Sequence, residues 1–113
     1  MEITVIVPIH EYKDSDKEML TKALNSVPKN TNILLACSNE SYETIVKEYG
    51  NENIRVINFE SKNFSTLINR AVENIETEWF SILEMDDEYT PIFDNSTGKF
   101  VYAHDVLIVI AKG

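Results

Sequence analysis

Four short runs of β-branched and other apolar residues recur along the chain, and segments with helical spacing separate them. The runs are Ile3–Ile9, Ile33–Cys37, Ile54–Phe59 and Trp79–Leu83. Runs that are this short and this uniformly apolar are typical of strands buried on both faces of a parallel sheet. The alternation therefore predicts an α/β fold with a mostly parallel sheet of four to five strands flanked by helices.

The first helix is expected between the first two strands. Ser15 and Glu18 have the spacing of a capping box, in which a hydroxyl and a carboxylate satisfy free backbone donors at a helix start. Pro28 should end this helix. Between these limits, apolar residues recur at helical spacing, at Met19, Leu20, Ala23, Leu24 and Val27.

A second helix is expected from about Tyr42 to Tyr49. Gly50 suits the C′ position after it, where glycine tolerates a left-handed backbone. The preceding segment Ser38–Ser41 is interpreted as a turn, because its small polar residues are typical of turns.

A third helix is expected from about Ser65 to Ile75, with Asn63 or Ser65 as its cap. Its apolar stripe should pack on the sheet and consists of Leu67, Ile68, Ala71, Val72 and Ile75. After Pro91 the sequence is interpreted as irregular, with a turn at 95–98 and a last apolar run at 106–111 that adds one further strand.

The amino-acid composition of the chain limits the classes of partner that it is expected to bind. The chain has 113 residues, of which 10 are basic and 19 acidic, so its formal net charge is −9. Nucleic acids and anionic membrane surfaces are bound through basic side chains, so this balance argues against both. No apolar run reaches the roughly 18 residues of a membrane-spanning helix, and no transmembrane segment is expected. The single Cys37 excludes an intrachain disulfide, fits a reducing cytoplasmic compartment, and is expected to be a small buried hydrophobe.

An acidic cluster follows the fourth strand, at Glu84, Asp86, Asp87 and Glu88. Carboxylates this close repel one another unless solvent or a cation relieves them. Hard oxygen ligands suit Mg²⁺ or Mn²⁺, which can bridge to substrate phosphates. From the spacing alone, a solvated acidic turn is the favoured interpretation, because short acidic runs are usually exposed charge.

Ligands of open parallel sheets bind beyond the carboxyl ends of the strands. Three polar segments follow strands and should converge at that edge, namely His10-Glu11, Ser38-Asn39 and Glu84–Asp87. The sequence therefore predicts a ligand site there. It shows no internal repeat and no interdomain linker, and residues 1–113 are expected to form a single domain.

Three segments carry a family resemblance. Thr4–His10 is similar to a first strand that usually ends Val-Pro-x-Tyr-Asn, and Asn63–Ala71 to a segment written Asn-x-Gly-x-x-x-Ala-x-Asn-x-Gly. Trp79–Asp87 is similar to the strand that leads into an Asp-x-Asp motif. In this order and spacing, they resemble the family-2 glycosyltransferases of the GT-A fold, over about residues 3–91. The resemblance implies a Rossmann-like half-domain, the N-terminal half that binds the nucleotide sugar.

The resemblance also implies a donor site for a nucleotide diphosphate sugar and a divalent Mn²⁺ or Mg²⁺. The positions that match nucleotide-binding positions of the family are Pro8, Ile9, Glu11, Ser38, Asn39, Asn69, Arg70 and Glu84. Among them, Ser38 and Asn39 stand where the family usually has a base-holding Asp, and Glu84 stands at the first Asp-x-Asp position. The metal would be carried by Asp86, at the second position, with Asp87 beside it.

Departures from the family pattern leave two functions open. The Tyr-Asn pair after the proline is missing, the base-holding Asp is replaced, and no general base for an inverting transfer is recognisable. Compared with the family, the domain looks truncated. The chain is therefore interpreted as the donor-binding portion of a glycosyltransferase, with little turnover alone. The alternative is a degenerate GT-A fold that serves as a non-catalytic binding or structural module, as a homo-oligomer or in a larger assembly such as a viral particle.

Overall fold

The computed structural model describes residues 3–29, 31–86, 90–94, 99–103 and 109–111, and their side chains up to Asp86. Its central sheet has five strands in the order β3-β2-β1-β4-β7. The strands are β1 (Ile3–Ile9), β2 (Asn32–Cys37), β3 (Ile54–Asn58), β4 (Trp79–Ile82) and β7 (Val109–Ala111). The first four run parallel, and β7 pairs antiparallel with β4 at one edge. The predicted α/β architecture with a mostly parallel sheet is confirmed.

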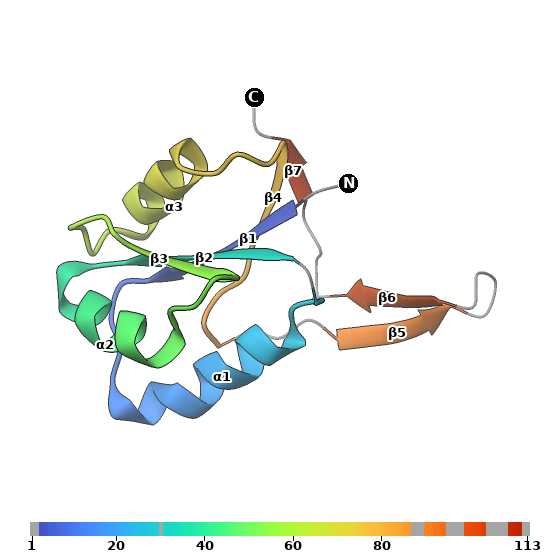
Figure 1. Ribbon diagram of the computed structural model, residues 1–113, viewed down its shortest axis with the longest axis horizontal. Coiled ribbons are helices and arrows are strands. Elements are labelled where there is room, and N and C mark those ends of the chain that lie inside the picture. The colour runs from blue at the N-terminus through green and yellow to red at the C-terminus, as the bar shows by residue number, and fades with distance from the viewer. Residues whose placement is uncertain (1–2, 30, 87–89, 95–98, 104–108, 112–113) are drawn as a thin grey trace.

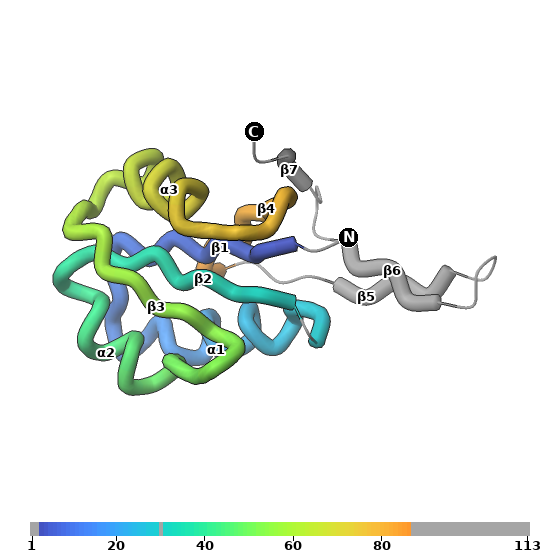
Figure 2. The backbone as a smooth tube through the Cα atoms, turned by 45° about the horizontal axis from the view of Figure 1, so that its top comes forward, coloured from blue at the N-terminus to red at the C-terminus, as the bar shows by residue number. Residues whose placement is uncertain are grey.

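Helices cover both faces of the sheet (Figure 1). They are α1 (Lys17–Ser26), α2 (Asn39–Tyr49) and α3 (Phe64–Glu73). Figure 2 shows α1 and α2 on one side of the strands and α3 on the other. Within the described part of the chain, no helix is long and apolar enough to cross a membrane.

Each face of the sheet has its own hydrophobic core, because successive side chains of a strand point to opposite faces. Val5, Val7 and Ile9 of β1 join the core under α1 and α2, whereas Ile6 joins the core under α3. Burial on both faces explains why β1 is apolar almost throughout. The third predicted helix is confirmed, with the Asn63 side chain accepting a hydrogen bond from the Thr66 amide at its start.

The expected Ser15–Glu18 capping box is wrong. A 3-10 turn, η1 (Asp14–Asp16), precedes the first helix, and α1 begins at Lys17. The Asp16 carboxylate accepts a 2.9 Å hydrogen bond from the Lys13 amide and fixes this turn. Because the turn moves the helix start, the capping geometry predicted for Ser15 does not form.

Two expectations about the second helix are also wrong. The segment Ser38–Ser41 is not a free turn, because α2 begins at Asn39 and Ser38 occupies its N-cap position. Gly50 has a φ of −63° and is not left-handed. A close approach explains the glycine instead, since a Cβ at this position would lie 2.7 Å from the Val46 carbonyl oxygen.

The region after Pro91 is not irregular. Strands β5 (Thr90–Asp94) and β6 (Lys99–Ala103) pair as an antiparallel hairpin, which extends away from the central sheet in Figure 1. The expected last strand is present as β7. The turn expected at 95–98 lies outside the described residues.

Candidate functional site

A pocket of about 360 Å³ opens at the carboxyl edge of the parallel strands. It is lined by Pro8, Ile9, His10, Glu11, Met19, Phe64, Glu84, Met85 and Asp86. These residues come from the end of β1, the segment after β4 and the first turns of α1 and α3. Because β1 and β4 are neighbours, the two strands deliver their following residues to one place. The Leu83 amide continues this pairing with a 2.9 Å hydrogen bond to the Ile6 carbonyl.

The pocket lining includes three carboxylates. Glu11, Glu84 and Asp86 line it, all three are exposed, and its described lining contains no Lys or Arg. No three His, Cys, Asp or Glu side chains of the described residues are grouped closely enough to hold a metal by themselves. Carboxylate oxygens of this kind suit a hard cation that keeps several waters and takes one or two protein ligands. The other predicted metal ligand, Asp87, lies outside the described residues.

The pocket lining also includes large apolar side chains, which the sequence interpretation missed. Phe64 and Met19 line the pocket and each is 40% exposed. Met85 is half-buried and packs against the core below. In the sequence, Met19 is one of the apolar residues at helical spacing, and Phe64 is not among the predicted site residues. A signal was present, because Phe64 lies one turn before Leu67 on the same helical stripe, directly after the cap Asn63.

The predicted nucleotide contact Ser38 is buried and hydrogen-bonded within the protein. Its hydroxyl donates to the His10 carbonyl at 2.9 Å, and its amide donates to the Ile9 carbonyl at 3.2 Å. The Ser41 hydroxyl donates to the same Ile9 carbonyl at 3.1 Å. The two serines thus attach the start of α2 to the backbone that lines the pocket. Ser38 itself is not among the lining residues.

Asn39, Asn69 and Arg70 also lie outside the pocket lining. The Asn39 side-chain oxygen accepts a 2.8 Å hydrogen bond from the Asn58 amide group, so the first turn of α2 contacts the end of β3. Asn69 is exposed on α3. The Arg70 guanidinium donates a 2.5 Å hydrogen bond to the Phe59 carbonyl. The structure therefore brings together five of the predicted site residues, which are Pro8, Ile9, Glu11, Glu84 and Asp86.

Comparison with known families identifies the chain. The family model described as Glycosyl transferase family 2 matches residues 4–112, almost the whole sequence. The chain belongs to this family. The resemblance carried by Thr4–His10, Asn63–Ala71 and Trp79–Asp87 is thereby confirmed.

Relatives of this family 2 chain are longer proteins. An uncharacterised glycosyltransferase of Rickettsia conorii is 28% identical over 93 residues, which cover 79% of this chain and 15% of that protein. Residues 1–349 of S. aureus TarS share the fold with a TM-score of 0.58 and 26% identity, over 80% of this chain and 29% of that one. The mannosyltransferase PcManGT of Pyrobaculum calidifontis, solved with GDP-Man and Mn²⁺, has a TM-score of 0.60 over 78% of this chain and 28% of that one. At 16% identity, this similarity shows the fold alone. The chain thus spans less than a third of each relative.

The Cys37 thiol of the family 2 chain is not a reactive nucleophile. Cys37 is fully buried at the end of β2, and burial raises the pKa of its thiol to about 12. A thiol with a raised pKa holds its proton at neutral pH and is a poor nucleophile. The expectation of a small buried hydrophobe at this position is confirmed.

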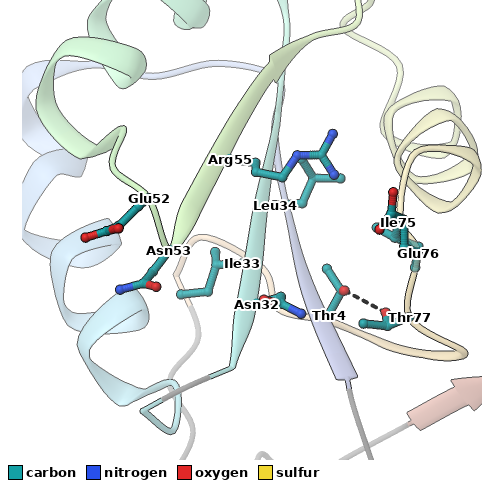
Figure 3. Close-up of a pocket in the computed structure, with 10 residues that line it drawn as sticks. All are labelled: Thr4, Asn32, Ile33, Leu34, Glu52, Asn53, Arg55, Ile75, Glu76 and Thr77. Carbon is teal, nitrogen blue, oxygen red and sulfur yellow. Dashed lines mark hydrogen bonds between the residues drawn. The ribbon is translucent and has the colours of Figure 1, made fainter.

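A second pocket, of about 310 Å³, lies at the opposite, amino-terminal edge of the family 2 sheet (Figure 3). Three of its polar side chains, those of Thr4, Thr77 and Arg55, already have partners in the protein. The Thr4 and Thr77 hydroxyls are 2.6 Å apart, and the Arg55 guanidinium donates to the Asn74 carbonyl at 3.0 Å. Sheets of this kind bind ligands at the carboxyl edge, so this pocket is not the candidate site.

Proposed function

We propose that the chain binds a nucleotide diphosphate sugar together with Mn²⁺ or Mg²⁺ and forms the donor-binding part of a glycosyltransferase. One observation carries the proposal. In a family 2 chain, the pocket at the carboxyl edge joins the end of β1 to the acidic residues that follow β4. Solved relatives of the same fold support the ligand class, because TarS has been solved with UDP and with UDP-GlcNAc, and PcManGT with GDP-Man and Mn²⁺.

The carboxylates of the pocket lining are where the diphosphate and the metal belong in this proposal. Without a cation, three carboxylates and a chain of net charge −9 repel a diphosphate. Asp86, with Asp87 after it, would hold the metal, and the phosphate oxygens would complete its ligands. When bound, the metal offsets the negative charge of the diphosphate leaving group. Glu84 would contact the ribose or the donor sugar.

The remaining proposed roles concern contacts with the nucleotide base and the positioning of the site by α3. Pro8, Ile9 and Glu11 line the pocket and would border the nucleotide base. Asn69 and Arg70 of α3 would help to position the nucleotide and the strand β4 that leads into the acidic residues. A cytoplasmic setting is part of the proposal and rests on the single cysteine alone.

A non-catalytic module is the second candidate, and the positions Ser38 and Asn39 favour it. They stand where the family resemblance implies a base-holding Asp, yet both side chains bond to the protein itself. A chain that has lost this contact can keep the fold for another purpose, since a fold does not fix a function. A folded chain that binds no nucleotide would favour this candidate.

Calorimetric titration of UDP and GDP, each with and without Mn²⁺, tests the proposal. Metal and nucleotide should bind cooperatively, with a coupling of about 1–3 kcal/mol. Asp86→Asn should remove this coupling, because the amide is a neutral and weaker ligand for a hard cation. Asp14→Asn is the matched control, since Asp14 is exposed on η1 and does not line the pocket. Nucleotide binding that is indifferent to Mn²⁺, or equal in the two variants, would contradict the proposal.

A further inference from the structure

Exposed apolar side chains gather at the pocket. Among the described side chains, the large hydrophobic residues that are exposed are Met19 at 40%, Val46 at 36% and Phe64 at 40%. Two of these three line the same pocket. Apolar surface left in water is unfavourable, and its concentration around a concave site is typical of a ligand-binding surface.

Helix geometry explains why Phe64 is not buried with its neighbours. Leu67 and Ala71 lie on the same stripe of α3, and both are fully buried under the helix. Phe64 occupies the first turn of α3, directly after the cap Asn63, and lines the pocket at the carboxyl edge of the sheet. The ring is therefore held by a capped helix at a fixed place, yet remains accessible.

The other helix contributes Met19 in a similar way. Its neighbour Leu20 is fully buried, whereas Met19 is exposed at the pocket. Together with the half-buried Met85, the two residues contribute one aromatic ring and two thioethers to the pocket lining. The lining also contains the carboxylates of Glu11, Glu84 and Asp86, and no Lys or Arg is among its described residues.

The pocket lining thus offers both carboxylates and apolar side chains, and a nucleotide uses both kinds of contact. A diphosphate needs the metal and therefore the carboxylates, whereas a planar base is uncharged and has an aromatic face. We infer that Phe64 is the surface on which the nucleobase of the donor stacks, with Met19 as a second apolar contact, and that both select for a nucleotide-activated donor. The inference rests on the proposed function and adds the residues that recognise the base.

Stacking of this kind recognises the class of ligand more than one base. Every nucleobase has a π-face, so an aromatic platform tolerates uracil and guanine alike. Loss of one stacking ring weakens binding roughly 5- to 100-fold, and loss of one thioether contact weakens it roughly two- to tenfold. Both uridine and guanosine diphosphates should therefore depend on Phe64.

The test compares ligands with and without a base. UDP, GDP and inorganic pyrophosphate are titrated in the presence of Mn²⁺ into the unaltered chain and into Phe64→Ala, Met19→Ala and Phe64→Tyr. Val46→Ala is the matched control, because Val46 is exposed but does not line the pocket. Thermal unfolding of each variant verifies that it is folded, which is expected because the altered side chains are exposed.

The expected result is a loss of UDP and GDP affinity of roughly 5- to 100-fold in Phe64→Ala and a smaller loss in Met19→Ala. Pyrophosphate affinity should stay within about twofold, and Phe64→Tyr should retain UDP binding because it keeps the ring. If Phe64→Ala binds UDP as tightly as the unaltered chain while Asp86→Asn does not, the inference is overturned and the proposed function stands. If the folded, unaltered chain binds neither UDP nor GDP with Mn²⁺, both are overturned.

Discussion

The Ser38 hydroxyl donates a 2.9 Å hydrogen bond to the backbone carbonyl of His10. Ser38 stands at the start of α2, and His10 is the residue after β1 that lines the pocket. The bond therefore fixes the chain direction at the end of β1, just where Pro8 and Ile9 enter the pocket lining. A position predicted to touch the ligand thus holds the backbone that lines the pocket.

Removal of this bond should destabilise the protein. Ser38 is 1% exposed, so Ser38→Ala leaves the His10 carbonyl without this partner and removes a polar N-cap side chain. The expected loss in free energy of unfolding is about 1–2 kcal/mol. Urea denaturation measures it, with Ser65→Ala on the exposed side of α3 as the matched control. Equal stabilities of the two variants would show that the bond contributes nothing.

Packing under α3 should depend strongly on Leu67. This side chain is 0% exposed and belongs to the core between α3 and the sheet. Leu67→Ala leaves a cavity there and should cost about 2–5 kcal/mol of unfolding free energy. Val46→Ala, at an exposed helical position, should cost less than about 0.5 kcal/mol. A loss below half a kcal/mol for Leu67→Ala in chemical denaturation would contradict the assigned core.

The central sheet could be predicted because burial on two faces leaves a plain pattern. Each of the four parallel strands falls on an apolar run, and the helical stripes lie between them. The hairpin β5–β6 could not be recognised in this way. Its two strands pair with each other in a separate two-stranded sheet, and Pro91 in β5 is a residue that disfavours a strand assignment.

The site residues whose positions follow from the strand order could be predicted, whereas those whose role depends on side-chain exposure could not. The positions of Glu11, Glu84 and Asp86 at one edge follow from adjacent parallel strands. The exposure of Met19 and Phe64 could not be predicted in this way. Helical periodicity shows which side chains share a face of the helix, but it does not show whether that face extends beyond the edge of the sheet.

The hydroxyl of Tyr49 should stabilise the contact between α1 and α2. It lies 2.9 Å from the Thr21 hydroxyl, and it donates to the Lys17 carbonyl at 3.3 Å. Tyr49→Phe removes these hydrogen bonds and should lower the free energy of unfolding by about 1 kcal/mol. Tyr42→Phe on the same helix is the control, because the Tyr42 hydroxyl has no hydrogen bond to another described residue. Thermal or urea unfolding would contradict the prediction if the two variants were equally stable.

Alkaline pH should destabilise the protein through Cys37. Its thiol has a pKa of about 12 in the folded chain against an ordinary value of 9.0, because burial disfavours the thiolate. As pH rises above 9.0, the unfolded chain loses this proton while the folded chain keeps it, so stability falls between pH 9.0 and about 12. The slope from this group approaches about 1.4 kcal/mol per pH unit, and no effect arises at neutral pH. The contribution of this thiol is measured by comparing the unfolding free energies of the unaltered chain and of Cys37→Ala between pH 8 and 10.5. Parallel pH dependences of the two proteins would contradict the assignment.

The two arginines of the chain allow the link between α3 and the pocket to be tested. Arg70 donates to the Phe59 carbonyl, just before the loop that leads to the cap Asn63 and to Phe64, whereas Arg55 makes a similar bond to the Asn74 carbonyl at the opposite edge. Arg70→Gln and Arg55→Gln should each lower the free energy of unfolding by about 1 kcal/mol, because each removes one charge-assisted bond at a partly exposed site. Only Arg70→Gln should also weaken binding of UDP with Mn²⁺, by roughly two- to fivefold, because a loosened loop must be ordered again on binding. Calorimetric titration of both variants compares the two effects, and full nucleotide affinity in Arg70→Gln would show that this bond stabilises the fold without reaching the site.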